Sequence, residues 1–381
     1  MNKKVLAVFG NVVLFGQERS NIKVFDTLKK QNVDLLLLVN DRGFQWHIQP
    51  EVEAHGLAYK KIRYPWNFRK SLNPKLLWNY LRDIWMYNVQ FLISYRQYKP
   101  DYIHIANDFY FLTLSPVLLF IKCPLIYRLG DKPVMRYFYE KMIWKKVIVK
   151  KVHHFVCISN FIARQLKLIK PNLNNYTIIY NIPPTRKIIL EENIPVYDKD
   201  WFTVTFVGQI DRIKGVDILF EAAKELITRH NSIRFILAGQ TMYSELYKAI
   251  QNDDFYKEHK QNFVFLNKVQ NIDLVYQNGD IHVAPSVVEE ALSNVVGEAK
   301  LNKKLSIVFD NGGLAELVSH QKDGYVCKES NKYCLIEAIE YYYNNPEEVS
   351  SQGKNAYDSM QNLGLTDEIF TQKWKEVYQI D

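Results

Sequence analysis

The sequence predicts an α/β protein made of two doubly wound, Rossmann-like domains that face each other across a cleft. Three observations predict this fold. The chain has 381 residues, which is more than a single hydrophobic core usually serves. It opens with a buried strand, a glycine-containing loop, a helix and a second strand, the usual start of a doubly wound sheet. The same order begins again after residue 200, behind a segment rich in proline and charge.

The first half of the chain alternates strand and helix patterns. Val5–Phe9 is a short apolar run ended by a glycine, which predicts a buried strand. Helical spacing follows at 22–28, and 34–39 is a second buried run. These elements predict a first domain over residues 1–185. Its further strands are expected at 102–105, 124–127, 155–158 and 176–180.

The second half repeats this organisation. We place a linker at 186–200, where proline and charged residues cluster. An apolar run at 203–207 predicts the next strand, and the one-sided apolar spacing of 216–229 predicts the helix after it. The second domain is expected to span 201–364. Its other strands are expected at 234–239, 263–265 and 281–284, and an amphipathic aromatic helix at 370–378 lies within a last segment, 365–381.

Composition narrows the class of protein. Hydrophobic residues make up 48% and charged residues 24% of the chain, which indicates a packed globular protein and not a disordered one. No apolar run is long enough to predict a membrane-spanning helix. The first residues read as a strand and not as a signal peptide. The four cysteines have no metal-binding or disulfide spacing, which favours a reducing, cytoplasmic setting.

The charge is divided unevenly between the two halves. Residues 1–190 carry a formal charge of +19 and residues 191–381 carry −11. The basic half is expected to face an anionic membrane surface, a polyanionic substrate or a nucleic acid. Within it, 60–100 and 141–151 combine lysine and arginine with tryptophan, tyrosine and isoleucine, a mixture that suits an anionic membrane. The alternative is that the aromatic residues are core and the cations are solvated. We expect no nucleic-acid partner, because no nucleic-acid-binding motif accompanies the charge.

The segment 285–299 holds the first candidate site. A strand ends at residue 284, a loop carries Glu290, a helix begins near Asn294, and Glu298 lies about one turn into it. The first amides of such a helix present positive charge to a diphosphate, and the two carboxylates could bind hydroxyl groups on either side. The alternative is an ordinary acidic helix start.

The segment 208–215 holds the second candidate site. Gly208 follows a strand and lets a ligand approach the backbone, while Arg212 and Lys214 could offset charge on a leaving group. The alternative is a turn with solvated charges. The segment matches neither the phosphate loop of ATPases nor the dinucleotide-binding glycine pattern.

Together these segments resemble the family 4 glycosyltransferases, which have the GT-B fold. The strongest part of the resemblance is the pair of glutamates Glu290 and Glu298, which have seven residues between them, with Asn294-Val295-Val296 before the second. Weaker matches lie in the first half of the chain. The resemblance also includes Gly208 with Lys214-Gly215, Asn311–Val318, Asp323-Gly324, Gly16–Arg19, Ile158-Ser159 and Tyr180–Pro183.

The resemblance implies a retaining glycosyltransferase (class EC 2.4) of hexosyl or N-acetylhexosaminyl type, which uses a nucleotide sugar such as a UDP-sugar and needs neither metal nor cofactor. Its acceptor would be a saccharide or a lipid-linked saccharide, in the synthesis of a cell-surface polysaccharide or glycolipid. The enzyme would be cytoplasmic and peripheral at the inner face of the membrane, with its last helix returning to the first domain.

The resemblance also implies roles for particular residues. Glu298 would hold the ribose, Lys214 would neutralise the pyrophosphate, and Glu290 would hold the transferred sugar. The remaining donor-site residues would be Gly208, Gln209, Leu292, Ser293, Asn294 and Val295. The acceptor-side candidates are Gly16, Gln17, His104 and Asn107. His104 follows a strand and is expected to face the cleft of the two-domain fold, and the alternative is a structural hydrogen-bonding role.

Three features of the sequence differ from that family or bear on its chemistry. The family usually has a basic residue where this chain has Gln209, and we hypothesise that Arg212 replaces that charge. The family often has a histidine after its fifth strand, where Asp131 is the nearest polar group here. Asp131 is a candidate for orienting the acceptor hydroxyl or the donor sugar, and the alternative is a helix-cap or turn residue. Asp198-Lys199-Asp200 resembles a metal-binding pair but lies in the linker, so we interpret it as solvated charge.

Two other functions compete with sugar transfer. A nucleotide-sugar 2-epimerase has the same fold and would consume donor without an acceptor. A non-catalytic basic protein that binds membranes or RNA would bind no nucleotide sugar and would be indifferent to the substitution Glu290→Ala.

Overall fold

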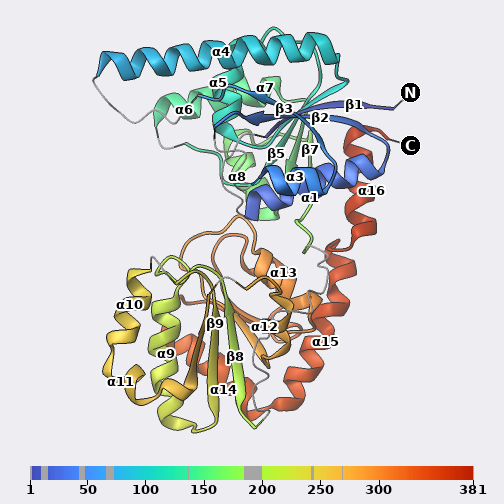
Figure 1. Cartoon of the computed structure of the whole chain (residues 1–381). Helices are drawn as coiled ribbons and strands as arrows, with labels where there is room; N and C mark the ends of the chain where they lie inside the picture. Colours follow the sequence, from blue (N-terminus) through green and yellow to red (C-terminus); the bar gives the residue numbers. More distant parts are fainter. Residues whose placement is uncertain are drawn as a thin grey trace. The chain divides into compact units, whose positions relative to one another are not determined.

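A computed structural model shows two sheets of parallel strands, each in its own unit (Figure 1). The structure describes residues 2–9, 16–42, 48–65, 73–135, 137–183, 200–241, 244–267 and 269–380. Unit 1 consists of Met1–Tyr180 and Asp367–Asp381, and unit 2 of Asn181–Thr366. Most of the expected linker, 186–199, lies outside the described residues.

Unit 1 contains a seven-stranded sheet in the order β3-β2-β1-β4-β5-β6-β7. All of its strand pairs are parallel, and the order reverses between β1 and β4. The carboxyl ends of two such strands border a crevice, the usual place for a ligand in a doubly wound sheet. The strands are β1 (Lys4–Phe9), β2 (Asp34–Asn40), β3 (Ala58–Ile62), β4 (Tyr102–Ile105), β5 (Leu125–Leu129), β6 (His154–Cys157) and β7 (Tyr176–Ile178).

The helices of unit 1 begin at polar caps and pack on this sheet. Asn73, Asn107 and Ser159 each accept a hydrogen bond from a backbone amide in the first turn that follows, which fixes where α4, α5 and α8 start. The last helix of the chain, α16, packs against α1 in unit 1. The helices are α1 (Gly16–Lys30), α3 (Gln49–Ala54), α4 (Pro74–Tyr98), α5 (Asp108–Leu118), α6 (Phe138–Ile143), a π-helical turn (Trp144–Ile148), α7 (Val149–Lys151), α8 (Asn160–Ile169) and α16 (Asp367–Tyr378).

Unit 2 contains a six-stranded parallel sheet in the order β10-β9-β8-β11-β12-β13. Its order reverses between β8 and β11, so the loops that follow these two strands meet at one edge. The strands are β8 (Phe202–Val207), β9 (Ile233–Ala238), β10 (Phe263–Leu266), β11 (Ile281–Ala284), β12 (Ser306–Phe309) and β13 (Gly324–Cys327).

The helices of unit 2 cover its sheet and enclose the core. One cluster of fully buried side chains includes Ile236 of β9, Tyr276 of α12 and Ala299 of α13. The helices are α9 (Val216–Arg229), α10 (Glu245–Asn252), α11 (Asp254–Glu258), α12 (Asp273–Gln277), α13 (Asn294–Leu301), α14 (Lys332–Asn344) and α15 (Pro346–Leu363), with 3₁₀ turns at Lys260–Asn262 and Ala315–Leu317.

The predicted fold class of two doubly wound α/β units is confirmed. The stretch at 60–100 contains the end of β3 and one 25-residue helix, α4. The basic stretch at 141–151 is divided between the end of α6, a π-helical turn and α7. Among the residues that the structure describes, every helix is too short or too polar to cross a lipid bilayer.

Candidate functional site

The loop after β8 is held tightly against the loop after β11. Gly215 caps α9 with a φ of 72°, and a Cβ atom at this position would lie 1.9 Å from the carbonyl oxygen of Pro285. The carbonyl of Ile213 accepts hydrogen bonds from the Val287 amide at 3.1 Å and from the Ser286 hydroxyl at 3.2 Å. Only glycine fits at residue 215, since the backbone is left-handed and the opposing loop leaves no space for a side chain. The two predicted site segments, 208–215 and 285–299, are therefore in direct contact.

This packing of the two loops brings Lys214 and Glu290 into contact. The Nζ atom of Lys214 lies 2.7 Å from Oε1 of Glu290, and the two side chains are 31% and 16% exposed. Asp211 accepts a hydrogen bond from the Lys214 amide at 2.8 Å and so orients the residue that carries the ammonium group. The two residues are 76 positions apart. They meet because β8 and β11 are neighbours in the sheet.

The backbone at Glu290 is fixed from its other side by two glycines. The Gly313 amide donates to the carbonyl oxygen of Glu290 at 2.7 Å. A Cβ atom on Gly312 would lie 2.6 Å from that same oxygen, and one on Gly313 would lie 2.3 Å from the carbonyl oxygen of Ala291. The Gly-Gly pair therefore lets two loops pack backbone to backbone, which holds the Glu290 carboxylate in place.

The N-terminus of α13 follows this loop. Ser293 is its N-cap residue and is 2% exposed. Within the described part of the chain its hydroxyl oxygen has no hydrogen-bond partner, although N-cap hydroxyls usually accept one from the helix. The first turn carries no acidic side chain. Its amides have no partner within the helix, so hydroxyl and amides together form a place suited to an anion.

Glu298 lies one turn further along α13 and is held by a tyrosine. The Tyr276 hydroxyl donates at 3.2 Å to Oε2 of Glu298, and it lies 3.1 Å from the carbonyl oxygen of Val295. Tyr276 is fully buried. It was missed in the sequence because a tyrosine in an apolar helix pattern reads as core. The side chain of Asn294 accepts a hydrogen bond from Asn181 at 3.1 Å, and Leu292 is buried beside the loop.

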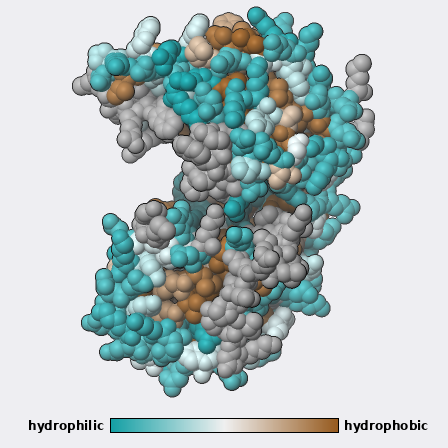
Figure 2. Space-filling view, in the orientation of Figure 1, coloured by the Kyte–Doolittle hydropathy of each residue, from teal (hydrophilic) through white to brown (hydrophobic). Residues whose placement is uncertain are grey.

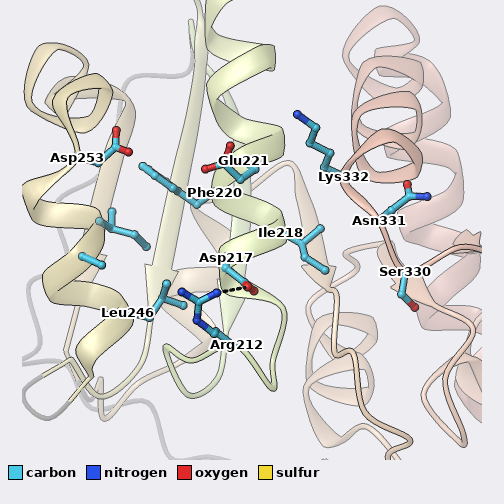
Figure 3. A pocket seen from close by; sticks show the side chains of 12 residues that line it. Arg212, Asp217, Ile218, Phe220, Glu221, Leu246, Asp253, Ser330, Asn331 and Lys332 are labelled. Carbon is cyan, nitrogen blue, oxygen red and sulfur yellow. Dashed lines mark hydrogen bonds and ion pairs between the residues drawn. The ribbon is translucent and has the colours of Figure 1, made fainter.

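Arg212 forms an ion pair with Asp217, at the start of α9. Its guanidinium group lies 3.3 Å from Asp217, and the side chain is 77% exposed. Arg212 lines a cavity of about 460 Å³ together with residues of α9, α10 and Lys332 of α14. Figure 3 draws these side chains and the pair of Arg212 with Asp217. Gln209 is exposed. The hypothesis that Arg212 replaces the missing charge requires the guanidinium to leave Asp217. It stays a prediction, and full activity in Arg212→Ala would contradict it.

In unit 1, three of the predicted acceptor-side residues meet at the carboxyl ends of β1 and β4. Gly16 begins α1, and the side-chain amide of Gln17 donates to the carbonyl oxygen of Ala106 at 3.1 Å. Asn107 caps α5 by accepting from the Phe109 amide at 2.8 Å. Gln17 and Asn107 line one small hollow together with Glu18, Asn21 and Tyr110.

His104, the fourth of these residues, is not at the open end of the sheet. It lies within β4, is completely buried, and its Nδ1 atom is 2.6 Å from the Tyr378 hydroxyl of α16. The expectation that it faces a ligand cleft is therefore wrong, because α16 covers this face of the strand. Burial, aided by the positive charge of Arg128, lowers the pKa of His104 to about 3, so the imidazole is neutral at physiological pH.

We predict that this burial makes unit 1 sensitive to acid. In the unfolded chain, where its pKa is near 6.5, His104 takes up a proton below that pH, whereas the folded state does so only near pH 3. The unfolded state then binds more protons, so the free energy of unfolding should fall by about 2 kcal/mol between pH 6.5 and pH 5. Urea denaturation at pH 7 and pH 5 should show a smaller loss for His104→Gln than for the wild type. Equal losses in the two proteins would contradict the prediction.

Asp131 lies in an exposed position just after β5. Partial desolvation raises the pKa of its carboxyl group, while a hydrogen bond from the Lys132 amide and the charge of Lys132 act in the opposite direction. The proposed role in orienting an acceptor stays a prediction.

A buried polar network beside the hollow of unit 1 was missed in the sequence. Arg128 of β5 donates to Asn21 of α1 at 2.7 Å, and Arg128, Asn21 and Glu18 are each at most 3% exposed. Burial lowers the pKa of Arg128 to about 10 against the raising effect of Glu18, so the guanidinium stays charged. A charged residue in the middle of an apolar strand was the available signal. The network fixes the first turns of α1, which carry Gln17.

The described residues include no cluster of three or more histidine, cysteine, aspartate or glutamate side chains that could hold a metal ion. In the linker segment Asp198-Lys199-Asp200, Asp198 and Lys199 lie outside the described residues. The expected absence of a metal therefore stays a prediction.

Comparison with known proteins gives a family match and several relatives. The model described as Glycosyl transferases group 1 matches residues 190–359. The uncharacterized glycosyltransferase MJ1607 of Methanocaldococcus jannaschii is 27% identical over 180 residues, which cover 46% of this chain and 45% of that protein. The capsular polysaccharide biosynthesis glycosyltransferase CapM of Staphylococcus aureus is 22% identical over 190 residues, which cover 50% and 49%. The chain thus spans about half the length of these curated relatives.

Solved structures match over the whole chain. Anabaena Alr3699/HepE, crystallised in complex with UDP, has a TM-score of 0.79 and 16% identity, with 99% of each chain covered. At this identity the likeness establishes a shared fold.

Proposed function

We propose that the protein transfers a sugar, with retention, from a nucleotide-sugar donor to a saccharide or lipid-linked saccharide. The match of residues 190–359 to the model described as Glycosyl transferases group 1 and the fold shared with solved glycosyltransferase structures support this proposal. One observation carries this proposal. The Lys214–Glu290 ion pair is joined, through the loop that carries Glu290, to an unpaired Ser293 hydroxyl at the N-terminus of α13.

The donor diphosphate is proposed to bind at the N-terminus of α13. The amides of its first turn point toward an incoming anion, and the Ser293 hydroxyl gains the hydrogen bond that it lacks. Lys214 then shifts its ammonium group from Glu290 to the phosphate, where negative charge develops as the bond to the sugar breaks. Glu290 is left to bind hydroxyl groups of the sugar, and Glu298 the ribose of the nucleotide.

The chemistry follows from this placement. The acceptor oxygen forms a bond to the anomeric carbon while the bond between that carbon and the diphosphate oxygen breaks. The acceptor proton passes to an oxygen of the departing diphosphate. The transition state has oxocarbenium character, so positioning and stabilisation of the leaving group supply most of the rate acceleration. Lys214 and the helix amides provide positive charge at the diphosphate, so we propose no metal requirement.

The substrates are proposed from the relatives and from unit 1. CapM is named for capsular polysaccharide biosynthesis and HepE was crystallised with UDP, which favours a UDP-hexose or UDP-N-acetylhexosamine donor and a cell-surface polysaccharide or glycolipid product. We assign the acceptor to the carboxyl-end edge of the unit 1 sheet beside Gln17 and Asn107, whose hollow of about 10 Å³ is no larger than one water molecule, with Asp131 orienting the acceptor hydroxyl. The enzyme is proposed to be cytoplasmic and to bind peripherally to an anionic membrane.

A panel of nucleotide sugars tests the donor site directly. UDP-sugars should raise the melting temperature of the protein by a few degrees without added magnesium, since a ligand at 100 times its Kd adds about 2.7 kcal/mol to the free energy of unfolding. GDP-, ADP- and CMP-sugars serve as the controls.

The product then tests the reaction itself. With a UDP-sugar that binds, NMR should show an anomeric configuration equal to that of the donor. Inversion would overturn the retaining mechanism, consumption of donor without an acceptor would favour an epimerase, and absence of any nucleotide-sugar binding would overturn the proposed function.

A further inference from the structure

Helix α4 carries large apolar side chains on its solvent-exposed side. Trp78 is 68% exposed and Trp85 is 63% exposed, and their spacing places them on one face of the helix. The other exposed apolar residues of α4 are Leu76, Leu77, Leu81 and Ile93. Figure 1 shows α4 as an outer layer of unit 1 with α5 next to it, and Figure 2 shows hydrophobic surface among the hydrophilic residues along this edge.

These side chains are not needed to build the core of unit 1. The opposite side of α4 already packs inward through fully buried Tyr87 and Phe91. Asn88 on that side donates to the carbonyl oxygen of Thr113 in α5 at 2.7 Å. The inner face of α4 is thus fully packed, while its outer face exposes two tryptophans. An exposed apolar face of this kind is suited to bind a partner outside unit 1.

The charges on α4 are one-sided. Its exposed surface carries Lys75, Arg82 and Arg96. The only acidic residue of the helix is Asp83, which is buried and lies 2.7 Å from Arg42 and 3.4 Å from Arg63. The outer face is therefore apolar and cationic, with no exposed carboxylate of its own.

A second segment of unit 1 has the same character. Phe138 is 78% exposed and Tyr139 is 58% exposed, and Tyr139 stacks on Tyr137 at a ring distance of 5.5 Å. The one acidic residue here, Glu140, accepts the Tyr137 amide at 2.8 Å as part of the cap of α6. The exposed cations that follow are Lys141, Lys145, Lys146 and Lys150.

We propose that the outer face of α4 and residues 137–150, here called the docking surface, bind the headgroup region of an anionic phospholipid membrane. Tryptophan and tyrosine side chains favour the boundary between lipid and water, and basic residues at the rim each add about fivefold to binding on anionic lipid. The helix lies in the membrane plane and does not span it. This deepens the proposed function by assigning its membrane contact to particular residues.

A second copy of the chain fits this surface less well. In a twofold dimer the same face meets itself, which would bring the cations of one α4 against those of the other. An anionic bilayer offers the complementary charge over the whole face.

The docking surface is connected to the acceptor hollow within unit 1. Tyr87 of α4 packs on Tyr64 at a ring distance of 4.5 Å, and Tyr64 packs on Tyr110 at 5.1 Å. Tyr110 belongs to α5 and lines the hollow with Gln17 and Asn107. Helix α4 thus packs, through Tyr64, on the residue that α5 contributes to the acceptor hollow, which suits a lipid-linked acceptor.

Vesicle sedimentation tests the proposal. The wild type should bind phosphatidylcholine vesicles containing 30% phosphatidylglycerol and should bind pure phosphatidylcholine at least tenfold more weakly. The double variant Trp78→Gln/Trp85→Gln should lose at least tenfold on the anionic vesicles. The matched control is Tyr333→Gln, an equally exposed aromatic residue of α14 in unit 2, which should bind like the wild type.

Three measurements keep the outcomes distinct. Stabilisation by UDP-sugar, measured on the same variants, reports the donor site in unit 2. If UDP-sugar still stabilises the protein but wild-type vesicle binding is absent or does not depend on anionic lipid, the proposed membrane contact of the docking surface is overturned. The transferase proposal is then unaffected. If light scattering shows that the wild type is a dimer and that the tryptophan substitutions dissociate it, the proposed membrane contact is overturned. The docking surface would then bind a second copy of the chain. Should the double variant misfold, quenching of wild-type tryptophan fluorescence by brominated lipid gives the answer, and no quenching would overturn the proposal.

Discussion

Replacing Glu290 by alanine should lower the kcat of sugar transfer about 100- to 1,000-fold, the usual cost of removing one well-placed polar group from a preorganised site. The structure gives the reason. The Gly312-Gly313 loop holds the backbone of Glu290, and Lys214 lies 2.7 Å from its carboxylate, so both position this group for the sugar. Glu289→Ala, at the exposed neighbouring residue, is the control and should remain near wild-type activity.

The partner of Glu290 refines this prediction. Lys214→Ala should lower kcat/KM by a similar factor, because the charge on the departing diphosphate loses its counter-ion. The double variant should be much less impaired than the product of the two single effects, since each single substitution already breaks the same ion pair. Steady-state kinetics of the four proteins measure this coupling. Two small and independent effects would show that the pair takes no part in the reaction.

Gly215→Ala should destabilise unit 2 by about 3 kcal/mol or more, as the left-handed backbone and the collision add together. The added Cβ atom would lie 1.9 Å from the carbonyl oxygen of Pro285 at a φ of 72°. The loops after β8 and β11 would have to separate, and Lys214 would move away from Glu290. Urea denaturation and UDP-sugar binding should therefore both be affected.

Gly297→Ala is the matched control for that substitution. This glycine lies inside α13, and a Cβ atom there would meet only Pro183, at an ordinary 3.6 Å. The change should stabilise the helix by about 0.5–1 kcal/mol. A stable Gly215→Ala protein with full donor binding would show that the two loops can separate without loss.

The part of the site that could be predicted from the sequence is the part fixed by sheet topology. A doubly wound order places β8 beside β11, so residues directly after these strands had to lie near each other, and Lys214 and Glu290 do. The direction of the Arg212 side chain could not be predicted in this way. It depends on its partner Asp217, the second residue of α9.

His104 shows a second limit of prediction from sequence. Its place in a strand was visible, but which face of the strand is covered depends on Tyr378, 274 positions later in the chain, and no local pattern reports that contact. The exposure of α4 was hidden for a related reason. A stripe of leucine and tryptophan at helical spacing has the same appearance whether it packs inward or faces water.

The contact between His104 and Tyr378 also has a consequence for biosynthesis. Unit 2 is continuous in sequence, whereas unit 1 needs α16 to cover the face of β4 that holds His104. While the chain is being made, residues 1–180 leave the ribosome with this face open, and they wait for all of unit 2 before the covering helix exists. Nascent unit 1 is thus the species most exposed to chaperones and to aggregation. All residues of unit 2 are therefore synthesised before unit 1 receives its last helix.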